Sequence, residues 1–367
     1  MSFSSIKKKK SFLTTELTLS LRKKAPGTRD LMVFCRQFAA LTGAGVSYLR
    51  SLQLLGELTE HGLLGEKIRE AASRLEEGYS LVESLRSGSD LFPPLLINMI
   101  EAGEAGGFLD ATLERLALYF EKQYELEQKI RSSTLYPKFI ACAAIIAAVF
   151  MVSAVLPAFA GIFENMGISM PVLTRLLISA GTWLSSCWPI IIMVIVAVFS
   201  LGRRVLKTQQ GRRFYDRLRL NNPFLGAVYR KMITARFCRT LGTLLGNGTA
   251  MLTALDLVKG IEDNSIYADI ISRTKEEIIR GQSLADSLAA VDFFPPLVVE
   301  MCSVGEQTGN MEGMLASTAG FFETEVSHII ERLCALLEPV LILFMAGIIV
   351  FIALSVLLPM FEVYQTI

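Results

Sequence analysis

The sequence predicts an all-α membrane protein with two duplicated cytoplasmic helical bundles, of about six helices each, and three transmembrane helices. Three observations predict this class. An internal repeat divides the chain into two similar units. Three apolar stretches are about as long as the roughly 20 residues that a spanning helix needs. Apolar residues in both units recur at helical spacing, with almost no strand-like alternation.

The internal repeat is visible in short motifs that keep a fixed spacing. Phe34-Cys35-Arg36 recurs as Phe237-Cys238-Arg239, an offset of 203 residues (34 to 237). One residue is then missing from the second copy, so that Phe92-Pro93-Pro94-Leu95 recurs as Phe294-Pro295-Pro296-Leu297 at an offset of 202 (92 to 294). A single slip with prolines and glycines in register indicates a duplicated unit.

The first helices of the first copy are bounded by residues that start and stop helices. Helical spacing begins at Leu31 and ends at Gly43-Ala44-Gly45, where glycine tolerates the left-handed backbone that closes many helices. Ser47 is a suitable N-cap for the second helix. A third helix is expected from about Leu63 to Glu77.

The last helices of each copy follow a second set of signals. Ser80 and Ser283 are placed to cap a short helix in each copy. The Phe-Pro-Pro-Leu elements are expected to start the next helix, because proline is preformed for a first helical turn. A tight turn is then predicted from Gly103 to Gly107, before a long helix that reaches from Leu109 toward Tyr136.

The topology follows from the repeat. Both copies run from bundle into bilayer in the same direction, so one additional crossing must lie between them. Charge orients the crossings, since Lys and Arg concentrate on the cytoplasmic side. Basic residues concentrate in two segments, at lysines 7–10 and in a group of arginines after residue 201. The loop from about Gly161 to Thr174 has no Lys or Arg. The N-terminus is therefore expected in the cytoplasm and the C-terminus outside it, in a multi-pass protein of the cytoplasmic (inner) membrane.

These features predict nine segments. They are a basic cytoplasmic tail (1–28), the first cytoplasmic helical domain (29–136), transmembrane helix 1 (137–160), a short extracytoplasmic loop (161–175), transmembrane helix 2 (176–201), a basic cytoplasmic linker (202–231), the second cytoplasmic helical domain (232–337), transmembrane helix 3 (338–359) and an extracytoplasmic tail (360–367).

No catalytic, cofactor-binding or metal-binding residues are predicted. The only two histidines, His61 and His328, lie in polar surroundings, and the cysteines have neither metal-site nor redox spacing. No Gly-x-x-x-x-Gly-Lys-Ser/Thr phosphate loop is present, so any energy for work is expected from a partner. The lysine run could suit nucleic acid, but a near-neutral net charge of +1 and an adjoining anionic membrane surface favour the membrane.

The motifs as a set resemble the type II secretion F family. They are the paired Gly-Glu-x-x-Gly segments (103–107 and 305–309), the two Phe-Pro-Pro-Leu elements, and the stretch from Val155 to Thr174. That family comprises inner-membrane platform proteins of type II secretion systems and type IV pilus machines. The resemblance implies a non-enzymatic platform that couples a hexameric assembly ATPase to the insertion of pilin or pseudopilin subunits. It also implies other inner-membrane assembly proteins as partners, and a homo-oligomer in the lipid bilayer.

The Gly-Glu-x-x-Gly segments hold the candidate site residues, which either fix a turn or contact a partner: Gly103, Glu104, Gly107, Gly305, Glu306 and Gly309. A glutamate near a helix start can accept backbone N–H bonds, which would be a purely structural role. The alternative is a contact point for the ATPase or for a sister subunit, although the structural role is favoured. For the whole chain, the alternative to a platform is a transporter or permease subunit, which the lack of ionisable residues in the apolar stretches disfavours.

Overall fold

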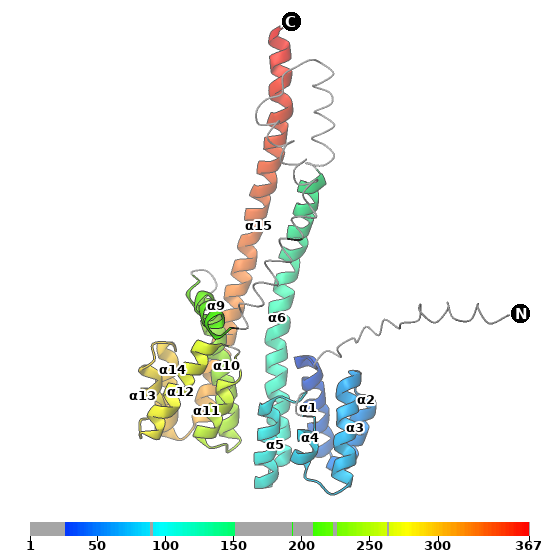
Figure 1. Ribbon diagram of the computed structural model, residues 1–367, viewed down its shortest axis with the longest axis vertical. Helices are drawn as coiled ribbons and strands as arrows, with labels where there is room; N and C mark the ends of the chain where they lie inside the picture. Colours follow the sequence, from blue (N-terminus) through cyan, green and yellow to red (C-terminus); the bar gives the residue numbers. More distant parts are fainter. Residues whose placement is uncertain are drawn as a thin grey trace, which may run out of the picture. The chain divides into compact units, whose positions relative to one another are not determined.

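A computed structural model describes residues 26–88, 91–150, 193, 208–222, 226–262 and 264–366. Every element in these ranges is a helix (Figure 1), as the sequence predicts. The chain divides into two compact units, Met1–Tyr124 and Glu125–Ile367. The first copy has α1 (Thr28–Gly43), α2 (Tyr48–Leu58), α3 (Gly62–Glu76), α4 (Leu81–Arg86), α5 (Pro94–Gly106) and α6 (Leu109–Phe150). Then come α9 (Gln209–Asn221), α10 (Gly226–Gly246), α11 (Met251–Lys259), α12 (Ser265–Ile279), α13 (Leu284–Ala289), α14 (Pro296–Thr308) and α15 (Met311–Thr366).

The duplication holds at the level of the backbone. The helices α1 to α6 correspond in order to α10 to α15, so each copy has the expected six helices in the described residues. Positive φ angles occur at Gly45, Gly78 and Gly107 in the first copy and at the equivalent glycines 248, 281 and 309 in the second. The same turns therefore interrupt both copies, and the repeat in sequence is a repeat in conformation.

The one-residue slip between the copies lies in a loop. Seven residues (87–93) separate α4 from α5, whereas six (290–295) separate α13 from α14. Both α5 and α14 begin with proline at the first helical position, as the Phe-Pro-Pro-Leu elements predict. The deletion thus shortens a connection and leaves all six helices of the unit in place.

The repeated motifs meet in the core of each bundle. Phe34 packs on Phe92 with ring centroids 5.7 Å apart, and the equivalent Phe237 and Phe294 are 4.5 Å apart. The phenylalanine of each Phe-Cys-Arg motif therefore contacts the phenylalanine of the Phe-Pro-Pro-Leu element of its own copy. All four side chains are at least nine-tenths buried. Offset or tilted aromatic pairs of this kind stabilise a core beyond the apolar area that they bury.

The turn predicted from Gly103 to Gly107 is shorter in the structure. Helix α5 continues through Gly103 and Glu104 to Gly106, and the chain turns only at Gly107, which has φ +72°. The second copy turns likewise at Gly309, with φ +69°. Since only the last glycine of each segment adopts the left-handed conformation, the other residues of the segment extend the helix.

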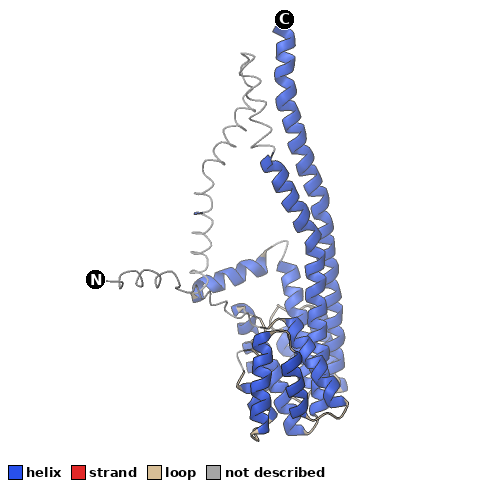
Figure 2. Cartoon of the chain, turned by 90° about the vertical axis from the view of Figure 1, so that its right-hand side faces the viewer, coloured by secondary structure: helices blue, strands red, loops and turns tan. Residues whose placement is uncertain are grey.

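Helix α6 runs without a break through Pro137, and from Glu125 onward it lies in the same unit as α15. Lys129 Nζ lies 3.6 Å from Glu331 Oε1, and Tyr136 O–H donates to Glu338 Oε1 at 3.3 Å. Both pairs join residues 202 apart, which are equivalent positions of the two copies. The two long helices are therefore paired here in parallel and in register, side by side in Figures 1 and 2.

The expected membrane segments fall partly outside the described residues. The whole predicted loop 161–175 and all of the predicted span 176–201 except Met193 lie outside them, as do residues 1–25 of the predicted basic tail. Among the residues that are described, none of the helices combines the length and the apolar character needed to cross a bilayer. The number of spans therefore stays a prediction.

Candidate functional site

The carboxylate of Glu104 binds the start of a neighbouring short helix. Leu81 N–H donates to Glu104 Oε1 at 2.9 Å, and Val82 N–H donates to Oε2 at 3.1 Å. These are the first two amides of α4, which have no carbonyl partner within their own helix. A carboxylate at this end also interacts favourably with the helix dipole. Glu104 thus ties α5 to α4 with both of its oxygens.

A capping box completes the start of α4. Ser80 Oγ accepts from Glu83 N–H, and Glu83 Oε2 accepts from Ser80 N–H, both at 3.1 Å. Together with Glu104, these side chains accept bonds from the four amides of residues 80–83. A helix of six residues has little intrinsic stability, so its position depends on such contacts.

The second copy repeats the arrangement in a weaker form. Leu284 N–H, the first amide of α13, donates to Glu306 Oε1 at 2.6 Å. Ser283 Oγ accepts from Asp286 N–H at 3.0 Å, as a cap should. Glu306 is exposed, whereas Glu104 is half-buried. The two glutamates therefore have the same fold position but differ in how much of each carboxylate faces solvent.

The glycines of the two segments have separate structural roles. A side chain at Gly103 would collide with Thr112 of α6, so this glycine lets α5 approach α6 closely. At the equivalent Gly305, an added Cβ would lie 3.0 Å from Met311 Sδ and 3.1 Å from Met311 Cα. Gly107 has open space around it but a left-handed backbone, which disfavours any residue with a Cβ.

An ion pair that joins the first and last helix of each copy escaped the sequence analysis. Arg239 Nε and Nη2 donate to the two carboxylate oxygens of Glu323 at 2.9 and 2.7 Å. At the equivalent positions, Arg36 Nη1 lies 3.6 Å from Glu121 Oε2. The arginine of each pair belongs to the repeated Phe-Cys-Arg motif. Its partner could have been found from the sequence, because Glu121 and Glu323 occupy equivalent positions of the two copies.

Comparison with known proteins supports the same division of the chain. The model of the family described as "Type II secretion system (T2SS), protein F" matches twice, over residues 34–157 and 237–359. The starts of the two matches are 203 residues apart and their ends 202, which are the two offsets of the internal repeat. The chain belongs to this family. Its duplicated unit is therefore the family's own unit, present here in two copies.

Relatives in the type II secretion protein F family extend along nearly the whole chain. The chain is 37% identical over 355 residues to the type IV pilus assembly protein PilC of Thermus thermophilus, covering 96% of this chain and 87% of that protein. It is 32% identical over 352 residues to the type II secretion system protein F of Xanthomonas campestris pv. campestris, with the same two coverages. A relative named for pilus assembly and one named for secretion thus both match nearly the whole chain, at 37% and 32% identity.

The histidines and the buried cysteines, which are the side chains most often used as nucleophiles or bases, have structural positions in this chain. His61 Nδ1 accepts from Leu64 N–H at 3.2 Å and so caps α3, and His328 Nδ1 lies 3.5 Å from Glu331 Oε2 on the surface. Burial raises the pKa of the Cys35 and Cys238 thiols, and burial with the nearby Glu306 carboxylate raises the pKa of Cys302 to about 12. Such thiols stay protonated at neutral pH and are poor nucleophiles. In the described ranges, no group of acidic, histidine or cysteine side chains could hold a metal ion.

Proposed function

We propose that the chain is a non-enzymatic membrane platform that couples a cytoplasmic assembly ATPase to the insertion of pilin-like subunits into a fibre. The observation that carries the proposal is the double match to the protein F family, at the offsets at which the two bundles repeat. Relatives named for type IV pilus assembly and for type II secretion cover nearly all of this chain. The fibre is accordingly a type IV pilus or a type II secretion pseudopilus.

The membrane arrangement is part of this proposal. Three spans, at 137–160, 176–201 and 338–359, place both bundles in the cytoplasm with the N-terminus inside and the C-terminus outside. Basic residues before the first apolar stretch and after the second support this orientation. The chain would then sit in the inner membrane as a homo-oligomer, beside other inner-membrane assembly proteins. In this position, its bundles can reach the ATPase and its apolar helices can reach the pilin or pseudopilin subunits.

Energy is expected to come from the partner ATPase. The sequence has no phosphate loop, and the histidines and the buried cysteines occupy capping, surface or core positions. A transporter function is disfavoured by the same absence of ionisable residues from the apolar stretches. Two bundles whose caps and ion pairs recur are suited to transmit a displacement from one partner to another, because a well-packed bundle moves as a unit.

Fibre formation in cells tests the proposed function. The gene for this chain is deleted in a strain that keeps its pilins and its assembly ATPase, and surface fibres or secreted substrates are counted with and without a plasmid copy. We expect fibres or secretion to be lost and then restored by the full chain, with pilin levels unchanged. Normal assembly in the deletion strain would overturn the platform proposal.

Thiol labelling tests the orientation. Cys238 is a poor reporter because it is fully buried and its pKa is raised. A chain with its own cysteines replaced by serine should carry one new cysteine at a time, at Glu164 in the predicted outer loop or at the exposed Thr253 of α11. In intact cells, an impermeant maleimide should label the Glu164→Cys chain only, whereas lysed cells should show both. Labelling of the Thr253→Cys chain from outside would reverse the topology.

A further inference from the structure

Helix α9 is fixed to the second bundle by one of its faces. Asp216 is 4% exposed, and its Oδ2 accepts from Ser265 N–H at 2.8 Å and from Ser265 Oγ–H at 2.7 Å. Ser265 begins α12, so an acidic residue of α9 caps the start of another helix. Leu220, one turn further along α9, is 8% exposed. Because this face is held by the bundle, the opposite face has a fixed direction.

The opposite face of α9 is apolar and uncovered in the described structure. Phe214 is 71% exposed, Leu218 59% and Tyr215 47%. Residues three and four apart lie on the same side of a helix, so these three side chains form one patch. We call it the α9 apolar face. Single exposed apolar residues are ordinary, but a contiguous group on a short, otherwise strongly polar helix indicates contact with an apolar medium or partner.

Arginines lie on both sides of the α9 apolar face. At about 100° per residue, Arg213 and Arg217 lie on one side of it and Arg219 lies on the other. The guanidinium carbon of Arg219 lies 3.8 Å from the centre of the Tyr229 ring, which orients this cation against the bundle. An apolar stripe between two cationic flanks is the pattern of a helix that lies in the plane of an anionic bilayer surface.

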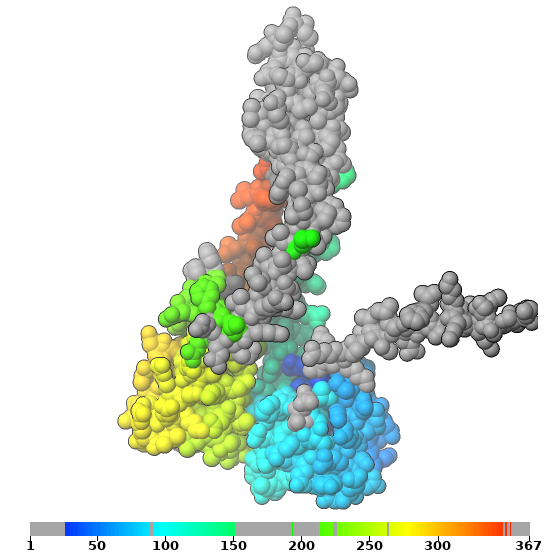
Figure 3. Space-filling model, in the orientation of Figure 1, coloured from blue at the N-terminus to red at the C-terminus, as the bar shows by residue number. Residues whose placement is uncertain are grey.

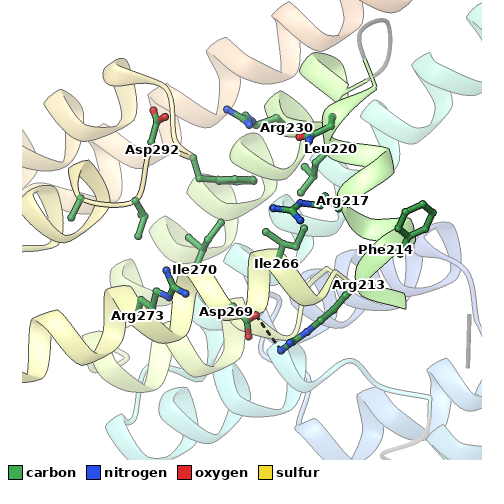
Figure 4. A pocket seen from close by; sticks show the side chains of 14 residues that line it. Arg213, Phe214, Arg217, Leu220, Arg230, Ile266, Asp269, Ile270, Arg273 and Asp292 are labelled. Carbon is green, nitrogen blue, oxygen red and sulfur yellow. Dashed lines mark ion pairs between the residues drawn. The ribbon is translucent and has the colours of Figure 1, made fainter. Parts of the chain in front are cut away.

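A cavity beside α9 collects further positive charge. It has a volume of about 740 Å³ and is open to solvent. Figure 4 shows that the residues lining it include four arginines: Arg213, Arg217, Arg230 and Arg273. Phe214 of the α9 apolar face also lines it. Two acidic residues also line it, Asp269 and Asp292, and Arg213 Nη2 lies 3.6 Å from Asp269 Oδ2. The excess of guanidinium groups suits phosphate oxygens, which arginine binds in a bidentate manner.

The direction of α9 agrees with such a surface. The helix is seen nearly end-on in Figure 1 and runs across the direction of α15 in Figure 2, and Figure 3 shows it in green at the surface of the second unit. It begins eight residues after the predicted span 176–201 (201 to 209). This inference rests on the proposed function, in which α15 continues into the membrane. A helix that runs across α15 and lies close to a span would then be parallel to the bilayer.

We propose that α9 lies in the cytoplasmic surface of the membrane and binds anionic phospholipid. The side chains of Phe214, Tyr215 and Leu218 enter the boundary between headgroups and acyl chains, while Arg213 and Arg217 hold lipid phosphates at the mouth of the cavity. Since Asp216 fastens the other face of α9 to α12, membrane contact fixes the height and tilt of the second bundle relative to the lipid.

Tryptophan quenching by brominated lipid tests the proposal in the full chain. The two native tryptophans, Trp183 and Trp188, are replaced by phenylalanine, and Phe214→Trp is introduced in nanodiscs that contain phosphatidylglycerol. Ile279→Trp is the matched control, because Ile279 is 62% exposed and ends α12 at the opposite end from Ser265. An in-plane helix buries its apolar face about 5–10 Å deep, within reach of bromine on the acyl chains.

We expect brominated lipid to quench most of the emission of the Phe214→Trp chain and to leave that of the Ile279→Trp chain unchanged. Equal, weak quenching of both would overturn the proposal. If Phe214→Trp responds to added cell extract but not to bromine, a protein rather than lipid covers this face and the lipid assignment is wrong. A chain that fails to enter nanodiscs at all would instead refute the membrane platform itself.

Varying the anionic lipid content of the nanodiscs tests the role of Arg213 and Arg217. In the Phe214→Trp chain, Arg213→Gln with Arg217→Gln should reduce quenching in discs that contain phosphatidylglycerol toward the level seen in pure phosphatidylcholine, since anionic headgroups attract each cation separately. Quenching that depends neither on these arginines nor on phosphatidylglycerol would overturn the assignment of anionic phospholipid.

Discussion

The glutamates of the two Gly-Glu-x-x-Gly segments differ in how fully their carboxylates are used. Among the described residues, both oxygens of Glu104 accept backbone bonds and one oxygen of Glu306 does. Glu306 is also the exposed member of the pair. The fold therefore engages both carboxylate oxygens of Glu104, whereas the exposed carboxylate of Glu306 is the one that a partner can reach. We propose that Glu104 fixes its turn, and that Glu306 also contacts a partner.

Replacing the two glutamates should separate these roles. Glu104→Ala leaves two amides without their acceptors and should lower the free energy of unfolding by about 1–3 kcal/mol. Glu306→Ala removes one bond at an exposed site and should cost about 1 kcal/mol or less. Hydrogen exchange of the peptides that contain α4 and α13 measures both effects locally. Equal loss of protection in the two copies would contradict the difference.

The conservative variant Glu306→Gln isolates a partner contact. It keeps an oxygen that can accept from Leu284 N–H, so stability should hardly change, while loss of the charge should weaken assembly if a basic partner group pairs with it. Glu104→Gln is the matched control and should leave assembly near normal. Normal fibre counts in both variants would leave only the fold-keeping role.

The glycines of the first segment should respond to alanine for different reasons. Gly103→Ala places a Cβ against Thr112 and should cost about 1–3 kcal/mol through overpacking. Gly107→Ala meets no neighbour but forces alanine into φ +72°, which costs about 1–2 kcal/mol. Gly43→Ala is the control, because it is helical, has open space and has no positive φ. Thermal melting should show a lower midpoint temperature for the Gly103→Ala and Gly107→Ala chains only. A lower midpoint for Gly43→Ala would contradict the roles given to Gly103 and Gly107.

At the scale of elements, the ion pairs between the first and last helix of each copy have diverged in burial. The side chains of Arg239 and Glu323 are 20% and 19% exposed, whereas those of Arg36 and Glu121 are 62% and 35% exposed. A part-buried bidentate pair loses more on truncation than an exposed one, because the remaining charge keeps little water. The second copy therefore depends more strongly on this link between α10 and α15.

Neutralising the acid in each copy tests this dependence. Glu323→Gln should lower the free energy of unfolding by about 1.5–3 kcal/mol, since it removes charged hydrogen bonds from a part-buried site. The equivalent Glu121→Gln should cost about 0–1 kcal/mol, as exposed pairs do. Both changes in the free energy of unfolding can be measured by denaturant titration, with helix content monitored by circular dichroism. A larger loss for Glu121→Gln than for Glu323→Gln would be inconsistent with the two geometries.

The register of α6 on α15 is a second property of the elements. In a chain whose native cysteines are serine, Lys129→Cys with Glu331→Cys should form an intramolecular disulfide on mild oxidation, because these side chains face each other. Lys129→Cys with Leu333→Cys is the control, since Leu333 lies on the other side of α15, about 200° around the helix. Mobility on denaturing gels reports the link. Efficient linking of the control pair would contradict parallel pairing in register.

Much of this architecture was predictable because it depends on local signals. Prolines at the starts of α5 and α14, serine caps on α4 and α13, and paired glycines act within a few residues of the sequence. The reach of Glu104 back to Leu81 and the pairing of Arg239 with Glu323 join positions that are 23 and 84 residues apart. No local pattern specifies such contacts, and the length of α5 past Gly103 likewise depends on its packing against Thr112.

At the scale of the whole molecule, a platform needs rigid parts and an external source of energy. The bundles supply the first, since the same caps, core pairs and ion pairs recur in both. We propose that the second comes from a partner ATPase, since the sequence has no phosphate loop. The α9 apolar face would add a contact with the lipid surface beside the second bundle. Movement would then reach the membrane through helices that continue directly from the bundles.

ATP turnover shows whether the chain acts on a partner ATPase and has no ATPase activity of its own. The rate of hydrolysis is measured for the chain alone in nanodiscs, for the assembly ATPase of the same cell alone, and for the two together. We expect no hydrolysis by the chain alone and a changed rate for the ATPase when the chain is present. Hydrolysis by the chain itself, free of contaminating ATPase, or an ATPase rate that is unaffected by the chain, would contradict this expectation.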